Sequence, residues 1–134
     1  MGSEADNAAK WGVMVKTILT VDDSPSMREA VKLTLTDAGY EVIEAVDGQD
    51  GLAKAQIKGV SLVLTDLNMP NMDGLSLTRA LRSLPDFNSI PVMVMSSDMP
   101  ASKKLAAEAA GACAWMSKPF KQEQLLAAVR QAIG

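Results

Sequence analysis

The sequence predicts a doubly wound α/β fold, in which helices cover both faces of a five-stranded parallel sheet. Three observations lead to this prediction. The 134 residues match the usual size of one domain, and 48% of them are apolar, which is enough to form a hydrophobic core. Short apolar runs alternate five times with stretches of helical spacing. Strict alternation of this kind is typical of parallel sheets, because each parallel strand needs a crossover connection to the next.

Five apolar runs have about the length of a buried strand. They are Thr17–Val21, Glu41–Ala45, Leu62–Thr65, Pro91–Met95 and Ala112–Met116. The only cysteine, Cys113, lies in the last run, so we expect its thiol to be buried and unreactive.

A stretch of helical spacing follows each run. In the first stretch, apolar residues lie three and four positions apart between Met27 and Ala38, which places them on one helix face. Pro25 suits the first turn of that helix, and Gly39 suits its end. The other helices are expected over Gln49–Lys58, Leu75–Arg82, Ser102–Ala110 and Leu125–Ile133.

The chain before the first strand has no periodic pattern. We expect residues 1–13 to be a flexible leader, either an expression remnant or an upstream extension, because Met14 opens a new apolar segment. Residues 14–134 are then the folded domain. No apolar run approaches the ~18 residues of a membrane span, and no signal peptide is recognisable, so a cytoplasmic location without membrane contact is expected.

The composition excludes several classes of catalytic site. The chain has no histidine and one cysteine, which rules out imidazole-based catalysis, zinc sites built on histidine, and disulfides within the chain. The formal net charge is −3, so a uniformly basic protein that coats nucleic acid is not expected. Any chemistry must therefore use carboxylates, hydroxyls, lysine or a bound ion.

Polar side chains stand where the predicted strands end. Asp22 and Asp23 follow the first strand, Asp66 the third, Ser96 the fourth and Lys118 the fifth. Ligands of such sheets bind outside the carboxyl ends of the strands. Polar residues are common at strand ends, so one of them means little, but five at the same edge indicate a site.

Three carboxylates in one crevice repel one another, and a hard divalent cation with oxygen ligands relieves that repulsion. Mg²⁺ suits such a site because it takes one or two carboxylates and leaves room for a phosphate. Lys118 offers a point charge to a phosphoryl oxygen, and Ser96 offers a hydroxyl donor. The turn after Asp66 leaves the Asn68 carbonyl available to a cation. Asp66 is the candidate nucleophile and would form an aspartyl phosphate.

Four segments carry these polar residues. They are Val21-Asp-Asp-Ser24, Asp66-Leu-Asn-Met-Pro-Asn-Met-Asp-Gly74, Pro91-Val-Met-Val-Met-Ser96 and Lys118-Pro-Phe120. Together, and in this order, they resemble the receiver domain of bacterial two-component response regulators in its CheY-like, chemotaxis-type form. The resemblance covers residues 16–133. It implies a flavodoxin-like sheet with the strand order 2-1-3-4-5.

The resemblance implies a role for each site residue. Asp66 would accept a phosphoryl group from the phosphohistidine of a partner kinase. Asp23, Asp66 and the Asn68 carbonyl would bind Mg²⁺ directly, and Asp22 would act mostly through a water molecule. Lys118 would pair with the phosphoryl group.

The resemblance also implies a switch between two conformations. Ser96 would move toward the phosphoryl group and hydrogen-bond it, and an aromatic side chain of the fifth strand would then shift inward. That aromatic position is Trp115, where tyrosine or phenylalanine is more usual. The family further implies a cis peptide bond between Lys118 and Pro119.

These features favour a stand-alone phosphoaccepting switch, which is not an enzyme acting on an external substrate. Its expected partners are a sensor histidine kinase as phosphodonor and a downstream protein such as a flagellar motor switch or a chemotaxis kinase. We expect neither nucleic acid nor a membrane as a partner.

Four other interpretations compete with this one. A phosphorelay shuttle, which passes the group from Asp66 to another protein's histidine, stays open, as does a receiver excised from a larger regulator. A haloacid-dehalogenase-type phosphatase also uses an aspartyl nucleophile, but it needs a second catalytic aspartate two residues later, where this chain has Asn68. A receiver that works without phosphorylation usually lacks an acidic residue or the lysine, and this chain lacks neither.

Overall fold

The computed structural model describes residues 15–57 and 59–134. Within these residues, five strands form one parallel sheet in the order β2-β1-β3-β4-β5, which confirms the predicted fold class and strand order. The strands are β1 (Thr17–Val21), β2 (Glu41–Ala45), β3 (Leu62–Asp66), β4 (Val92–Ser96) and β5 (Ala114–Ser117). The predicted leader 1–13, the start at Met14 and the helix end at Lys58 lie outside the described residues.

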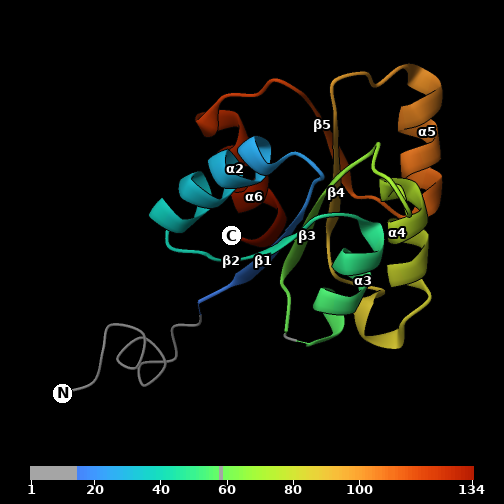
Figure 1. Ribbon diagram of the computed structural model, residues 1–134, viewed down its shortest axis with the longest axis horizontal. Helices are drawn as coiled ribbons and strands as arrows, with labels where there is room; N and C mark the ends of the chain where they lie inside the picture. The colour runs from blue at the N-terminus through green and yellow to red at the C-terminus, as the bar shows by residue number, and fades with distance from the viewer. Residues whose placement is uncertain (1–14, 58) are drawn as a thin grey trace.

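Five α-helices alternate with the strands, as predicted. They are α2 (Pro25–Asp37), α3 (Gly48–Ile57), α4 (Gly74–Arg82), α5 (Ala101–Ala110) and α6 (Gln122–Ile133). Figure 1 shows α2 and α6 on one face of the sheet and α3, α4 and α5 on the other. A short 3₁₀ turn, η1 (Pro85–Phe87), was not predicted, because three residues are too few to show a period.

The two faces of the sheet form two apolar cores, because successive side chains of a strand point to opposite faces. From β1, Ile18 packs in a cluster with Leu35 of α2 and Leu125 of α6. The next residue, Leu19, packs in the other cluster with Leu77 of α4. All four leucines and Ile18 are buried almost completely. The helices α2, α4 and α6 are therefore each held by an apolar face, and α5 packs through Ala107 in a third, smaller cluster.

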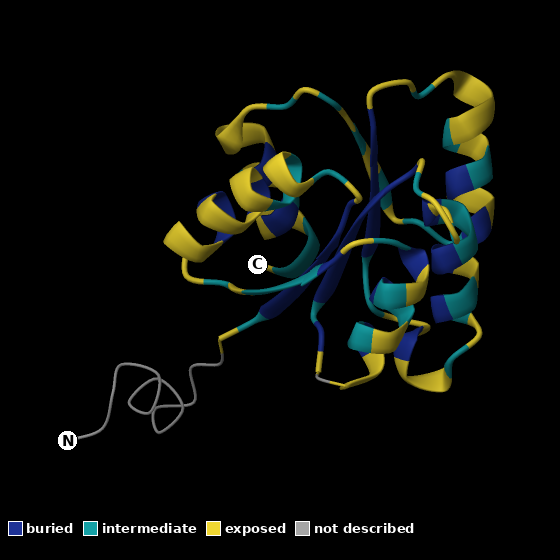
Figure 2. Cartoon of the chain, viewed as in Figure 1, coloured by how far each residue is buried: buried dark blue, intermediate teal, exposed yellow. Residues whose placement is uncertain are grey.

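The strands differ in burial according to their place in the sheet (Figure 2). The inner strands β1, β3 and β4 are buried along their whole length, whereas the edge strands β2 and β5 are largely half-exposed or exposed. β5 begins at Ala114, two residues later than predicted, and Cys113 is exposed. The expected burial of Cys113 is wrong because the residue precedes an edge strand, which has a neighbour on one side only.

Two capped helices begin directly after the loops that carry acidic residues. Ser24 caps α2 by accepting a hydrogen bond from the Met27 amide at 3.3 Å. Asp73 caps α4 by accepting one from the Ser76 amide at 2.8 Å. Because each cap fixes where its helix begins, it also fixes the short loop between the helix and the preceding strand. No helix in the described part of the chain is long and apolar enough to cross a bilayer.

Candidate functional site

Three carboxylates meet at the carboxyl edge of the sheet. Asp66 is the last residue of β3, and Asp22 and Asp23 follow β1, which pairs directly with β3. One oxygen atom from each of the three lies within 4.8 Å of the others. Asp22 is fully buried, Asp66 is 9% exposed, and Asp23 is exposed to solvent. The predicted acidic residues therefore surround one point that opens to solvent on the Asp23 side.

Lys118 reaches this point from the loop after the edge strand β5. Its Nζ atom lies 2.9 Å from Oδ2 of Asp22 and 3.2 Å from Oδ1 of Asp66. The Lys118 amide donates to the Ser96 carbonyl at 2.8 Å, which ties the loop to the end of β4. The peptide bond between Lys118 and Pro119 is cis, so that prediction is confirmed.

Burial and the close approach of these charges shift two pKa values. Burial, with a smaller contribution from the negative charge of Asp22, raises the pKa of Asp66 although Lys118 opposes the shift. Burial alone would lower the pKa of Lys118, but its hydrogen bond to Asp22 and the charges of both aspartates raise it. Lys118 therefore stays protonated, while Asp66 takes up a proton more readily than an ordinary aspartate.

The two carboxylate oxygens of Asp66 have different surroundings. Oδ1 accepts a hydrogen bond from the Leu67 amide at 3.0 Å and pairs with Lys118. Oδ2 has no hydrogen bond or ion pair from any residue that the structure describes. One oxygen is thus anchored and orients the group, and the other is available to a ligand or to an electrophile.

The loop after Asp66 folds back against the strand end. A Cβ atom on Gly74 would lie 2.3 Å from the Asp66 carbonyl oxygen, so this position requires glycine. The Gly74 amide donates to the Leu67 carbonyl at 2.9 Å and closes the loop. Asn68 lies exposed on this loop, and its carbonyl accepts no hydrogen bond within residues 15–57 and 59–134.

The donor set fits a hard divalent cation. Three carboxylate groups and a free carbonyl supply only oxygen atoms, which Mg²⁺ prefers, and no thiol or imidazole lies in the cluster. The cluster places three formal negative charges against the single positive charge of Lys118. A divalent cation would balance the remaining negative charge.

The predicted switch residues lie on the neighbouring strands β4 and β5 and do not bond to the acidic cluster. Ser96 is buried, and its hydroxyl donates to the Asp98 carbonyl at 3.1 Å and accepts from the Asp98 amide at 3.2 Å. Trp115 of β5 is 37% exposed, and Nζ of Lys104 lies 3.8 Å from the centre of its ring. In this conformation the hydroxyl is held by its own loop and the ring lies at the surface.

Sequence reasoning missed one residue near the site. Arg28, which the sequence does not single out, turns inward from α2 and donates from Nη1 to the Asp22 carbonyl at 2.6 Å. Its Nε atom lies 3.5 Å from Oε1 of Glu44 on β2. A charged residue inside a predicted strand, such as Glu44, was the available signal, because a half-buried charge usually has a partner.

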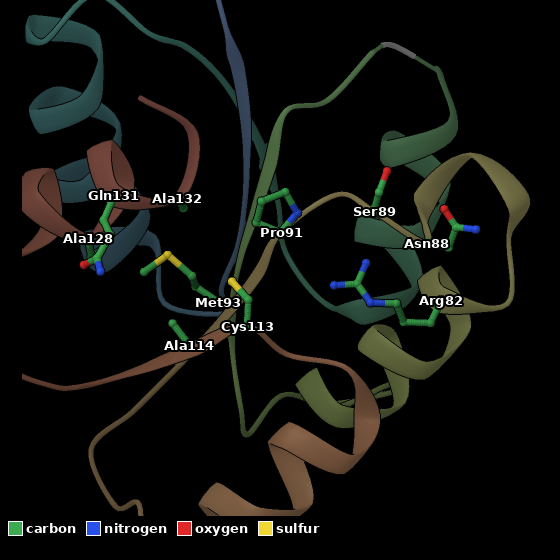
Figure 3. A pocket seen from close by; sticks show the side chains of 10 residues that line it. All are labelled: Arg82, Asn88, Ser89, Pro91, Met93, Cys113, Ala114, Ala128, Gln131 and Ala132. Atoms are coloured by element: carbon green, nitrogen blue, oxygen red, sulfur yellow. The ribbon is translucent and has the colours of Figure 1, made fainter.

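A pocket of about 400 Å³ lies at the opposite end of the strands, where β4 and β5 begin (Figure 3). Its only charged lining residue is Arg82. The Arg82 guanidinium already donates to the carbonyls of Phe87, Ile90 and Gly111 at 2.6–3.1 Å. None of the acidic-site residues lines the pocket, so it is not part of that site.

Comparison with known proteins identifies relatives of this chain. The family model of the response regulator receiver domain matches residues 18–130. The chain is 31% identical over 113 residues to protein PilG of Pseudomonas aeruginosa, and the match covers 84% of both proteins.

Solved structures show the same similarity. The chemotaxis protein CheY4 of Vibrio cholerae is 38% identical and superposes with a TM-score of 0.87 over 89% of this chain and 99% of that one. The receiver domain of the sensor histidine kinase PA1611 from Pseudomonas aeruginosa PAO1 is 26% identical, with a TM-score of 0.83 over 90% and 99%. That structure has a magnesium ion coordinated in the active site cleft.

Proposed function

The chain belongs to the response regulator receiver family, and from that premise we propose that it is a Mg²⁺-dependent switch that accepts a phosphoryl group on Asp66. The observation that carries this proposal is the acidic cluster itself. Asp66 has one oxygen anchored by Leu67 and Lys118 and the other without a partner among the described residues. A nucleophile needs such an arrangement, because the group must be oriented and yet free to form a bond.

In the proposed reaction, Oδ2 of Asp66 attacks the phosphorus atom of a phosphohistidine on a partner kinase. The new P–O bond forms as the P–N bond breaks, and the leaving imidazole nitrogen keeps the electron pair of that bond. The product is an acyl phosphate on Asp66. The histidine has to come from the partner, since this chain has none.

The other site residues stabilise charge during this transfer. Lys118 carries a fixed positive charge next to Asp66 and would pair with a phosphoryl oxygen. Ser96 ends the neighbouring strand β4, and its hydroxyl would exchange the Asp98 backbone for the phosphoryl group. Phosphoryl transfer relies on such positioning and charge neutralisation more than on covalent chemistry by several groups.

We propose that Asp23, Asp66 and the Asn68 carbonyl hold Mg²⁺, with Asp22 contributing mostly through a water molecule. Bound there, Mg²⁺ would neutralise negative charge on the phosphoryl oxygens. The oxygen-only donor set supports this assignment. The magnesium ion described for the related PA1611 receiver domain supports the metal.

The output is proposed to be a phosphorylation-dependent contact with another protein in the cytoplasm. Ser96 and Trp115 would transmit the change from the site to the surface around β5, where Trp115 is exposed. The likeness to the chemotaxis protein CheY4 favours a chemotaxis-type partner, such as a flagellar motor switch or a chemotaxis kinase.

Labelling with a small phosphodonor tests the proposal. The protein is incubated with Mg²⁺ and acetyl phosphate, and its intact mass is measured. We expect one phosphoryl group on the wild-type protein, none on Asp66→Asn, and none on the wild type after chelation of Mg²⁺.

Asp37→Asn is the matched control, because Asp37 is an exposed carboxylate outside the acidic cluster. It should label like the wild type. Equal labelling of the wild type and Asp66→Asn would refute the assignment of the acceptor.

A further inference from the structure

Arg28 contacts the backbone of the acidic site and not its carboxylates. The Arg28 side chain is 14% exposed, and Nη1 donates to the Asp22 carbonyl oxygen at 2.6 Å. The contact joins the first turns of α2 to the end of β1, six residues earlier in the chain. A hydrogen bond from a charged donor at this distance is among the stronger ones in proteins.

With this contact, every polar atom of the buried residue Asp22 has a partner. Its amide donates to the Ala45 carbonyl at 3.1 Å, and Oδ1 accepts from the Ser24 amide at 2.9 Å. Oδ2 accepts from Lys118 at 2.9 Å, and the carbonyl accepts from Arg28. Because Asp22 has no exposed surface, water cannot replace a lost partner without rearrangement of the site.

The carbonyl that Arg28 holds belongs to the peptide unit between Asp22 and Asp23. This unit is planar, so the direction of its carbonyl also sets the direction in which the chain leaves toward Asp23. Asp23 is exposed, and no side-chain hydrogen bond or ion pair holds it within the part of the chain that the structure describes. Its position beside Asp22 and Asp66 therefore depends on the backbone that precedes it.

Glu44 of β2 holds the guanidinium from the other side. Its Oε1 atom lies 3.5 Å from Nε of Arg28, and its Oε2 atom lies 3.4 Å from Nζ of Lys32. Nε of Arg28 is buried and makes no hydrogen bond, so this ion pair is its compensation. The guanidinium is thus fixed between a carboxylate on one strand and a carbonyl on the next.

We infer that Arg28 is a positioning residue for the cation site: it fixes the Asp22–Asp23 peptide and thereby places the Asp23 carboxylate for the metal. The inference rests on the proposed function, in which the acidic cluster binds Mg²⁺. Arg28 affects the Mg²⁺ affinity of the site in two opposite ways. The positive charge of Arg28 repels a nearby cation, whereas its hydrogen bond organises the ligands.

A variant without the Arg28 side-chain donor shows whether charge repulsion or the organising hydrogen bond has the larger effect on Mg²⁺ affinity. Isothermal titration calorimetry with Mg²⁺ at about 0.15 M ionic strength compares the wild type with Arg28→Met. Loss of a charge-assisted hydrogen bond predicts Mg²⁺ binding that is about five- to tenfold weaker in the variant. A role limited to charge predicts the opposite, tighter binding.

Lys32→Met is the matched control, since it removes a positive charge next to Glu44 on the same helix without touching Asp22. Its Mg²⁺ affinity should stay within about twofold of the wild type. Arg28→Lys keeps a donor that can reach for the same carbonyl and should recover part of the lost affinity. Recovery of this kind would not follow from a loss of guanidinium packing alone.

A second readout separates positioning from general damage to the fold. In acetyl phosphate labelling, the Mg²⁺ concentration for half-maximal rate should rise in Arg28→Met, while the rate at saturating Mg²⁺ stays near that of the wild type. If Arg28→Met does not fold, Glu44→Gln replaces it. That variant keeps the bond to Asp22 but loosens the guanidinium, and should weaken Mg²⁺ binding about two- to threefold.

The possible failures are distinguishable. Wild-type protein that binds no Mg²⁺ would refute the proposed function, and this inference would fall with it. Wild-type protein that binds Mg²⁺, together with an Arg28→Met variant that binds it equally or more tightly, would overturn the inference alone.

Discussion

The acidic half and the output half of the carboxyl edge of the sheet are held in different ways. In the acidic half, formed by β1, β3 and their loops, Asp22 is fully buried and each of its polar atoms has a partner. In the output half, formed by the end of β4 and by β5, the Ser96 hydroxyl bonds only to its own loop at 3.1–3.2 Å. Trp115 there is 37% exposed and covered by one lysine.

This difference matches what each half has to do. A site that receives a phosphoryl group works best when its charges are already in place, because reorganisation adds to the barrier. A surface that reports the event has to change between two conformations of similar free energy. Several strong contacts therefore fix the acidic half, whereas weak and replaceable contacts hold the output half. Five predictions test this contrast.

Lys118→Met should produce the largest loss of stability. The substitution leaves the buried carboxylate of Asp22 and the nearly buried one of Asp66 without their common cation, so the free energy of unfolding should fall by about 3 kcal/mol in Mg²⁺-free buffer at neutral pH. Urea unfolding of the wild type and the variant measures this loss. Lys104→Met in the output half is the comparison and should cost less than about 1 kcal/mol. Equal losses of stability in Lys118→Met and Lys104→Met would contradict the difference between the two halves.

The stability difference between the wild type and Lys118→Met should also depend on pH in the alkaline range. The pKa of Lys118 is raised in the folded protein, so its stabilisation is fully present below the ordinary value of 10.5. It is lost as the pH rises through the higher folded pKa. Wild type and Lys118→Met should therefore converge in stability at strongly alkaline pH.

Acidification should stabilise the wild type relative to Asp66→Asn. The pKa of Asp66 is raised above 3.8 by burial, so the folded state binds this proton more tightly than the unfolded state. The contribution of Asp66 to the free energy of unfolding then rises as the pH falls through its folded pKa. The rise amounts to about 1.4 kcal/mol for every tenfold difference in proton affinity between the folded and unfolded states.

Urea unfolding of both proteins in Mg²⁺-free buffer, from neutral pH to pH 4, measures this difference. A difference that stays constant or changes in the opposite direction would show that burial does not control the Asp66 carboxyl.

Asp23→Asn should stabilise the metal-free protein slightly. The substitution removes one of three neighbouring negative charges, and because Asp23 is exposed the gain should stay below about 1 kcal/mol. Millimolar Mg²⁺ should reverse the order, since the wild type then gains the free energy of metal binding. Thermal unfolding with and without Mg²⁺ measures both effects. Glu29→Gln, which removes an exposed negative charge on α2, should change neither the stability of the metal-free protein nor the gain from Mg²⁺. If Mg²⁺ reversed the order of stability for Glu29→Gln too, the assignment of Asp23 to the metal site would be contradicted.

Lys104→Met should have the smallest effect and confine it to the output half. Loss of the ammonium group 3.8 Å from the Trp115 ring costs about 0.5–1 kcal/mol and uncovers the ring. Acrylamide quenching of Trp115 fluorescence should increase, measured with Trp11→Phe in both proteins so that one tryptophan reports. Lys103→Met should leave quenching unchanged. A change in Mg²⁺ affinity in Lys104→Met would show that the two halves are more tightly linked than their contacts indicate.

The sequence alone determined the element order and the edge of the sheet at which the polar residues gather. Apolar spacing is a local property, so the alternation of strands and helices can be read without knowledge of the fold. Parallel strands end at the same edge, so Asp22, Asp23 and Asp66 could be placed together before any distance was known. The turn after Asp66 could be predicted from equally local residues, and Asp73 and Gly74 shape it in the structure.

Only the tertiary structure decided which side chains touch across elements distant in the chain. Lys118 reaches over from the loop after an edge strand to Asp22, 96 residues earlier, and Arg28 turns inward from its helix to the Asp22 carbonyl. Cys113 is exposed because the strand that follows it lies at the edge of the sheet. These outcomes depend on side-chain direction and on the neighbours that packing supplies, and residue spacing along the chain carries neither.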